Sequence, residues 1–535
     1  MNLWYKNAVV YCVDLDAFMD SDGDGWGDFR GLSARLDHIE TLGATCVWLL
    51  PFYPSGGRDN GYDVTDFYAV DPRFGTLGDF VDFMHHARDR GLRVLVDLVV
   101  NHTSTEHPWF KAARSDPNSP YRDWYIWSEK KPKDGNEGMV FPGAQESTWT
   151  YDDAAGAWYF HRFYEHQADL NTANPAVRDE IRRIVGFWLE LGVAGFRVDA
   201  VPFLIEHGGP DGADPTELLD ELNAFLVWRR AGAVLLAEAN VTMSEAKTYF
   251  GDGDRMHLVF NFLQNQQLWL AFARGDARPI ERILRAAPTL PPTSQWVTFL
   301  RNHDELDLGR LTEKQRAEVF AAFGPEETMQ IYGRGLRRRL APMFEGNLSR
   351  LKMAFSLMLS LPGTPMIWYG DEIGLGEDLS LRERESVRLP LQWSAAANGG
   401  FSEARKRDLV RPVVEEGPFA YRNVNIAAQR TDLDSLFNTV GRLVRLRRAT
   451  PEIGWGECTI LDTDVRSVLA LRYDWMDGAV VVLHNLAAEP VIVTVEGAGG
   501  DTQELTRGAE PLRPGEPLAL EGYGYRWYRL GGDRR

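Results

Sequence analysis

The stretch RVLVDLVVNH, residues 93–102, decides the fold. Its apolar run is interrupted only by Asp97 and ends in Asn101 and His102. A continuous apolar run of this length is typical of a strand that is buried on both faces, as in a parallel sheet. Seven further runs have the same character, at residues 7–15, 44–51, 194–200, 234–239, 257–262, 296–304 and 364–372. We therefore expect eight buried strands.

The segments between these runs have the period of amphipathic helices. In residues 175–191 apolar side chains recur every three or four positions, with Asn174 as a suitable N-cap and Pro175 at the first helical position. Residues 433–444 repeat the pattern, starting with Leu433. Eight alternations of strand and helix predict the α/β class and a (β/α)8 TIM barrel.

The spacing of the runs also predicts where the domains divide. Residues 103–172 are rich in Trp, Tyr, Pro and Gly, and they are too many for a loop without structure of its own. Past Pro451, strand-like segments such as SVLALRY (467–473) and AVVVLHNL (479–486) alternate with Gly/Pro turns. We expect a catalytic barrel formed by residues 1–102 and 173–450, an inserted subdomain at 103–172, and a C-terminal antiparallel β-sandwich at 451–535.

Composition narrows the class of function. The 535-residue chain is 44% hydrophobic and 25% charged, as a globular protein is, and its net charge is −19. Such a charge argues against nucleic acid as a partner and fits a small neutral substrate. No run is long enough to span a membrane, and the first residues do not have the pattern of a secretory signal. Three scattered cysteines suggest neither a disulfide framework nor a zinc site, so we expect a cytoplasmic protein.

Three carboxylates follow three different predicted strands. Asp199, Glu238 and Asp304 therefore converge on the mouth of the barrel, where the active sites of this fold lie. Arg197 lies on the same strand face as Asp199 and is placed to keep it ionised. Any one such carboxylate is more often a helix cap than a catalyst. Three together, beside Arg and His, indicate the paired acids of glycoside hydrolysis.

Four segments carry a family resemblance. DLVVNH (97–102), GFRVDA (195–200), LLAEAN (235–240) and FLRNHD (299–304) resemble the signature stretches of the α-amylase clan, glycoside hydrolase family 13. QADLN (167–171) resembles the family's fifth motif, although Ala168 stands where Pro is usual. The order and spacing of the segments also fit.

The resemblance implies a role for each matching residue. Asp199 would be the nucleophile, Glu238 the general acid/base, and Asp304 the residue that stabilises the transition state. Further residues implied in substrate binding are Asp59, Tyr62, His102, Arg197, His303 and Arg388. The implied mechanism retains configuration through a β-glucosyl-enzyme, with the two carboxyl groups about 5–5.5 Å apart.

Within the family, several segments resemble the trehalose-synthase branch, which isomerises maltose and trehalose. They are WLLPFYPS (48–55), FLRNHDEL (299–306), GLRRRLAP (335–342) and LPGTPMIWYGDEIGLG (361–376). The resemblance therefore implies isomerisation with side hydrolysis, in a pocket closed largely by the insertion. The chain departs from its relatives at Asp14 and Asp16, and RLPLQW (388–393) replaces a more usual RTPMQW.

Two other functions remain open. One is an α-glucosidase or transglucosidase that acts on maltose, sucrose or another small α-glucoside. The other is a family member that has lost its activity and become a scaffold, which the presence of all three carboxylates argues against. No feature of the sequence indicates an oligomeric state, and no organic cofactor is expected.

The loop DSDGDGWGD, residues 20–28, begins like an EF-hand. It lacks the glutamate at position 12, where Gly31 stands, and the segment before it is strand-like. Relatives in the family carry a similar loop, and four close carboxylates need a neutralising charge, so we expect one structural Ca²⁺. Its ligands would be Asp20, Asp22, Asp24, Asp28 and the carbonyl of Trp26. The alternative is a solvated turn.

Overall fold

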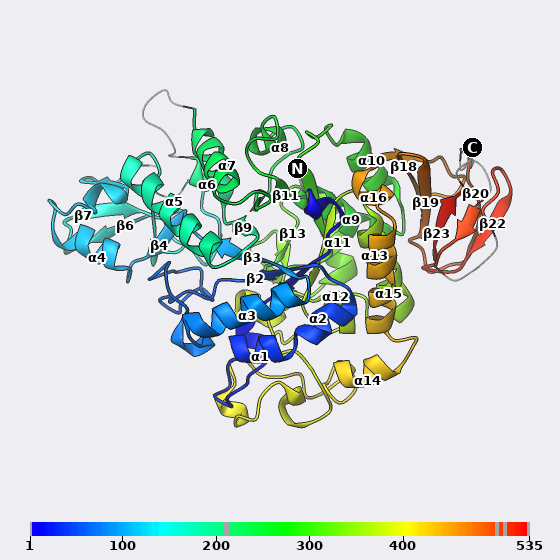
Figure 1. Cartoon of the computed structure of the whole chain (residues 1–535), viewed down its shortest axis with the longest axis horizontal. Helices are drawn as coiled ribbons and strands as arrows, with labels where there is room; N and C mark the ends of the chain where they lie inside the picture. The colour runs from blue at the N-terminus through cyan, green and yellow to red at the C-terminus, as the bar shows by residue number, and fades with distance from the viewer. Residues whose placement is uncertain are drawn as a thin grey trace.

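A closed barrel of eight parallel strands forms the centre of the protein (Figure 1). The computed structural model describes residues 3–133, 135, 137–206, 214–497, 502–506 and 511–531. The barrel strands, in their order around the ring, are β1 Val10–Val13, β2 Cys46–Leu49, β3 Arg93–Leu98, β9 Gly195–Val198, β10 Val234–Ala237, β11 Leu258–Phe260, β12 Gln295–Phe299 and β16 Thr364–Trp368. The predicted (β/α)8 barrel is confirmed.

The strands are shorter than the apolar runs that predict them. β3 ends at Leu98, before the polar end of the run. His102–Ser104 form a separate strand, β4, which pairs with β8 (Gln167–Asp169). Polar residues that follow the barrel strands therefore lie beyond the strand ends, at the mouth of the barrel.

Helices cover the barrel. Asn174 caps α5 (Pro175–Glu190) by accepting a hydrogen bond from the Ala176 N–H, as predicted. The prediction of a helix from residue 433 is wrong at its start: Leu433 is 77% exposed, and Ser435 caps α15 (Leu436–Ala449). The other long helices are α3 Leu77–Asp89, α7 Glu217–Arg229, α9 Phe262–Arg274, α10 Arg278–Ala286, α11 Glu313–Phe323 and α13 Leu348–Ser360. None of the described helices has both the length and the apolar character needed to cross a bilayer.

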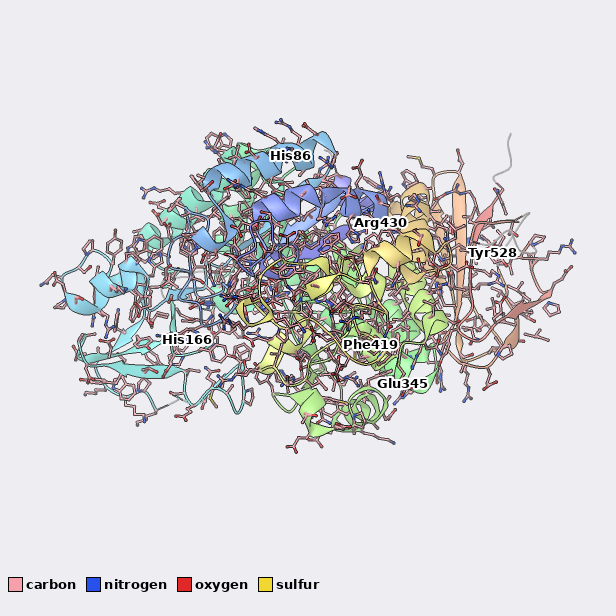
Figure 2. All side chains as sticks on the ribbon, turned by 90° about the horizontal axis from the view of Figure 1, so that it is seen from below. His86, His166, Glu345, Phe419, Arg430 and Tyr528 are labelled. Carbon is pink, nitrogen blue, oxygen red and sulfur yellow. The ribbon has the colours of Figure 1, made fainter. Side chains whose placement is uncertain are left out.

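The chain between β3 and α5 builds one end of the molecule. It contains α4 (Pro108–Ser115), the β4–β8 pair and a three-stranded antiparallel sheet of β5 (Trp127–Ser128), β7 (Ala157–Phe160) and β6 (Trp149–Asp152). His166 lies toward this end and Tyr528 toward the opposite end (Figure 2). The limits set above for the three domains stay predictions.

Antiparallel sheets form the other end. A five-stranded sheet is built from β17 Glu457–Ile460, β18 Val468–Trp475, β19 Gly478–Asn485, β23 Tyr525–Leu530 and β21 Thr502–Glu504, and a two-stranded sheet from β20 Val491–Thr494 and β22 Pro517–Leu520. β18 is buried on both faces. Leu469 and Leu471 join the main core, whereas Val468 and Ala470 join a second core shared with Leu520 of the small sheet.

Candidate active site

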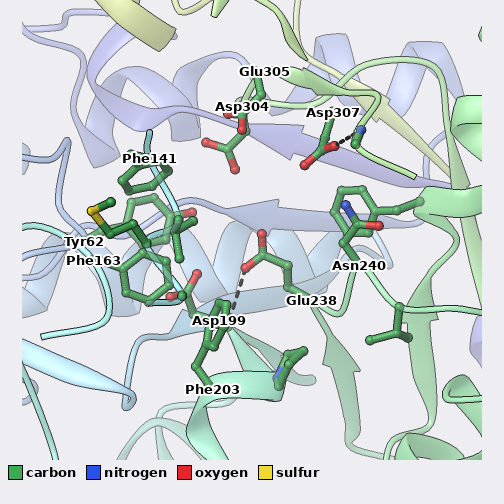
Figure 3. Close-up of a pocket in the computed structure, with 18 of the residues that line it drawn as sticks. Tyr62, Phe141, Phe163, Asp199, Phe203, Glu238, Asn240, Asp304, Glu305 and Asp307 are labelled. Carbon is green, nitrogen blue, oxygen red and sulfur yellow. Dashed lines mark hydrogen bonds between the residues drawn. The ribbon is translucent and has the colours of Figure 1, made fainter. Parts of the chain in front are cut away.

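A cavity of about 760 Å³ opens at the carboxyl ends of the barrel strands. Asp199 directly follows β9, Glu238 directly follows β10, and Asp304 lies five residues after β12 (Figure 3). All three side chains line the cavity. Backbone bonds between neighbouring strands fix two of them, because the Asp199 N–H donates to the Leu98 carbonyl and the Glu238 N–H to the Val198 carbonyl.

Arg197 joins the two carboxylates that were predicted to act as a pair. Its Nη1 lies 2.5 Å from Oδ1 of Asp199 and 2.9 Å from Oδ1 of Asp97, and its Nη2 lies 2.8 Å from Oε2 of Glu238. The guanidinium is almost fully buried, so the three ion pairs are shielded from water. One rigid cation thus sets where the Asp199 and Glu238 carboxyl groups lie. The predicted separation of these groups stays a prediction.

A backbone feature also holds Glu238. Ala200 has a left-handed conformation, with φ of 50°, which is unusual for a residue with a Cβ. This turn directs the Ala200 N–H to Oε2 of Glu238 at 3.1 Å. The donor fixes one oxygen of the carboxyl group, while 26% of the side chain remains exposed toward the cavity.

The three carboxyl groups differ in acidity. Burial raises the pKa of Asp199 to about 6, and Arg197 opposes the rise. Burial also raises the pKa of Glu238 to about 7, with Arg197 opposing and the charges of Asp199 and Asp304 adding to the rise. Burial acts against ionisation of Asp304 as well, but His303, Arg384 and Arg388 outweigh it and hold its pKa well below the usual range. Near pH 6.5 the site therefore combines a retained proton on Glu238 with anions at the other two positions.

This order of pKa values predicts a narrow bell-shaped pH profile. A nucleophilic Asp199 must be ionised, so kcat/KM should rise with pH up to about 6. A proton-donating Glu238 must be protonated, so kcat/KM should fall above about 7, both limits being apparent values of the coupled pair. Initial rates of maltose turnover between pH 4.5 and 9 measure the profile, because the departing glucose of maltose needs the proton. Activity that stays constant up to pH 9 would contradict the role given to Glu238.

A family model described as "Alpha amylase, catalytic domain" matches residues 13–331 and 337–456. The chain belongs to the α-amylase family. The trehalose synthase of Thermus thermophilus is 42% identical over 493 residues, which are 91% of this chain and 50% of that protein. The trehalose synthase/amylase of Mycobacterium tuberculosis is 40% identical over 563 residues, 99% of this chain and 93% of that protein.

Solved structures of α-amylase family enzymes share the whole architecture. A crystal structure of a mutant trehalose-6-phosphate hydrolase from Bacillus licheniformis superposes with a TM-score of 0.79 at 26% identity. The superposition covers 99% of this chain and 100% of that one. The curated relatives differ in length, since this chain spans half of the T. thermophilus protein and 93% of the M. tuberculosis protein.

The structure separates the predicted substrate-binding residues into two groups. Asp59, Tyr62 and His102 line the cavity. Arg197 and His303 are buried and lie outside its lining. His303 lies behind two residues that line the cavity and contacts both of them. Its Nε2 lies 2.8 Å from the Tyr62 hydroxyl and 3.0 Å from Oδ2 of Asp304.

The position of Arg388 does not support its predicted contact with substrate. The side chain is fully buried and is not part of the cavity wall. Its Nε donates to the His303 carbonyl at 2.8 Å, and its Nη2 donates to Oδ1 of Asp304 at 3.1 Å. Arg388 therefore lies behind Asp304 and supports it.

Arg384 is a wall residue that the sequence reasoning missed. It donates to Oδ1 of Asp59 at 2.8 Å and to Oδ1 of Asp304 at 2.7 Å, and it packs over the ring of Phe141. Gln167, within the fifth motif, donates to the other oxygen of Asp59 at 2.9 Å. The signal that points to Arg384 is its position four residues before Arg388, in the same arginine-rich segment.

Three loops meet over one side of the cavity. Phe141 packs against Tyr164 and Tyr332, with ring centroids 4.8 and 5.0 Å apart. The Tyr164 hydroxyl donates to Glu383 at 2.9 Å, and Arg334 donates to the Val140 carbonyl at 2.8 Å. We call Phe141, Tyr164, Tyr332 and Glu383 the roof. It joins the insertion to the loops that follow β12 and β16.

The acidic loop at residues 20–28 lies apart from the cavity lining. Asp20, Asp22 and Asp28 each place a carboxylate oxygen within 4.8 Å of the others. Asp28 also caps α1 (Phe29–Ala34) through the Gly31 N–H. Asp24 is outside this group and accepts a hydrogen bond from the Trp26 N–H. Burial and the charge of Asp24 raise the pKa of Asp22. The donor set of hard oxygens fits Ca²⁺.

Proposed function

We propose that this α-amylase family member isomerises maltose and trehalose through a β-glucosyl-enzyme, with some hydrolysis. The observation that carries the proposal is the pairing of Asp199 and Glu238 on one buried guanidinium, opposite Asp304, inside a cavity. Two relatives of about 40% identity that bear the name trehalose synthase support the interpretation of this protein as an isomerase.

In the first half-reaction, Asp199 attacks the anomeric carbon of the bound glucosyl unit. The carbon–oxygen bond to the second glucose breaks as Glu238 donates its proton to the leaving oxygen. The pKa values of about 6 and 7 support the roles in this direction, since the more basic group retains its proton. In this proposal the anionic Asp304 stabilises positive charge that develops on the sugar ring.

In the second half-reaction, the freed glucose rotates and presents its anomeric hydroxyl in place of its 4-hydroxyl. Glu238 takes the proton of that hydroxyl as its oxygen attacks the anomeric carbon of the glucosyl-enzyme. The bond to Asp199 breaks, the Asp199 carboxylate is released, and trehalose forms. A cavity of about 760 Å³ is in the range that holds a disaccharide. The roof supports the proposal because it covers one side of the cavity, and water that enters there would compete for the glucosyl-enzyme.

Incubation with maltose and ¹³C NMR of the products tests the proposal. We expect trehalose as the main product, with a minor fraction of glucose. The alternative, an α-glucosidase or transglucosidase, would give glucose or longer oligosaccharides without trehalose. The same experiment started from trehalose should approach the same final mixture, because an isomerase reaches one equilibrium from both sides.

The charges around the cavity favour a neutral sugar over a phosphorylated one. Among the residues that the structure describes, seven acidic ones line it: Asp59, Asp199, Glu238, Glu245, Asp304, Glu305 and Asp307. Three arginines also lie in this described part of the wall, of which Arg334 and Arg384 are paired with carboxylates. Arg310 donates to a backbone carbonyl. A phosphate would meet net negative charge here, so trehalose 6-phosphate should be a poor substrate.

A structural Ca²⁺ at Asp20, Asp22 and Asp28 is a separate part of the proposal. The ion would neutralise three close carboxylates and hold the loop, without taking part in the chemistry. EDTA should then lower the melting temperature by about 2–5 °C, and added Ca²⁺ should restore it. The D22N variant serves as the matched control, because its melting temperature should not respond to EDTA. A native protein that is equally insensitive would show that the loop is a solvated turn.

A further inference from the structure

A buried charge cluster, formed by Asp14, Asp16 and Arg411, lies beside the catalytic cavity. Asp14 and Asp16 follow β1, and both are at least nine-tenths buried. Nη2 of Arg411 is bonded to both carboxylates, at 3.3 Å from Oδ2 of Asp14 and more closely to Oδ1 of Asp16. Burial, with the charge of Asp16, raises the pKa of Asp14 to about 8.

The other nitrogens of Arg411 reach two segments that build the cavity. Its Nε donates to the Arg388 carbonyl at 2.6 Å, and its Nη1 lies 3.4 Å from Oδ1 of Asn60. Arg388 in turn supports Asp304. Asn60 has a left-handed φ of 48° and directly follows Asp59, which lines the cavity. One side chain thus contacts Asn60, the neighbour of Asp59, and the backbone of Arg388, whose side chain supports Asp304.

Arg411 is itself held by the acidic loop. Val410 donates its N–H to the Gly25 carbonyl at 2.9 Å, and Ser402 donates its hydroxyl to Oδ2 of Asp20 at 2.5 Å. Gly25 has a φ of 102°, and a Cβ there would lie 2.0 Å from the Asp408 carbonyl oxygen. The close approach fixes the segment before Arg411 against the loop.

We propose that Arg411 is a positioning residue for the part of the cavity that holds the transferred glucose. It fixes Asn60 and Arg388, and through them it sets the distance between Asp59 and Asp304. The guanidinium of Arg384 is ion-paired with both Asp59 and Asp304, so a shift of either carboxylate breaks an ion pair. The proposal rests on the glucosyl chemistry proposed above and does not depend on isomerisation.

The test measures kcat/KM for 4-nitrophenyl α-glucoside and for maltose in R411L, R411K and the double variant D16N/R411L. We expect R411L to lower kcat/KM for both substrates by the same factor, about ten- to hundredfold, because small misplacements at an active site cost this much. The ratio of trehalose to glucose should stay unchanged, since the acceptor side is untouched. R411K should recover part of the loss.

The double variant separates positioning from charge balance. D16N removes the charge that R411L leaves unpaired, so the melting temperature should return toward the native value while kcat/KM stays low. Recovery of kcat/KM together with stability would overturn the proposal, as would an R411L protein whose kcat/KM is native. R407L is the matched control, because this exposed arginine lies in the same segment and should leave kcat/KM native. If the native protein cleaves the aryl glucoside but forms no trehalose, the proposal of isomerisation is refuted and the proposal for Arg411 is not.

Discussion

Replacing Asp199 with asparagine is expected to lower kcat for maltose by more than about 10³-fold without unfolding the protein. The amide has nearly the same shape as the carboxylate, but it does not attack the anomeric carbon. Arg197 keeps its contacts with Asp97 and Glu238, so its buried guanidinium stays hydrogen-bonded. Steady-state rates of the D199N protein measure the loss of kcat, and a thermal melt shows whether the protein stays folded.

The identity of the nucleophile has a second, direct readout. A slow fluorinated glucosyl donor should leave a covalent glucosyl group on the peptide that contains Asp199 in the native protein, and none on D199N. D89N, an exposed position on α3, is the control and should keep native kinetics. A D199N protein with kcat within tenfold of the native value would refute the assignment.

The E238Q variant should show a loss that depends on the leaving group. Maltose needs a proton on its departing oxygen, so its turnover should fall by about 10³-fold or more. An aryl α-glucoside with an acidic phenol leaves without protonation, and its first half-reaction should be nearly native. Stopped-flow release of the phenol, compared with steady-state maltose turnover, measures the difference.

Azide distinguishes the two carboxylates further. In E238Q it should attack the accumulated glucosyl-enzyme without base assistance and give α-glucosyl azide. The basic limb of the pH profile should also disappear in this variant, because the group that loses its proton near pH 7 is gone. Equal losses for maltose and for the activated glucoside would place the proton donor elsewhere.

The sequence predicts the barrel well because its strands are buried on both faces. Runs such as 93–102 and 234–239 have no competing interpretation once eight of them alternate with helices. Their ends are less predictable, since a run does not show where the backbone leaves the sheet. Leu433 shows a second limit of prediction from hydrophobic spacing. It fits the helical period, yet Ser435 caps the helix, so Leu433 lies before the helix and is exposed to solvent. A side-chain cap decides that boundary, and hydrophobic spacing does not report it.

The candidate site is predictable where residues sit at strand ends. Asp199 and Glu238 follow their strands directly, so parallel strand order alone brings them together. Arg384 and Arg388 come from a loop whose path depends on tertiary contacts, and spacing cannot tell which of them faces the cavity. Arg411 is further removed, because its role appears only when Asp14 and Asp16 are seen to share it.

The double burial of β18 has a consequence for how this chain can be recombined. One face of the strand belongs to the barrel's core and the other to the C-terminal sheets. The seam is also polar: Ser356 of α13 lies 2.9 Å from Nε2 of His484 and accepts a hydrogen bond from the Trp527 indole. The terminal sheets therefore cannot be exchanged as an independent domain. A chimaera that exchanges them must bring its own α13, whereas the insertion, which connects β3 to α5, offers the natural breakpoint for grafting a new specificity.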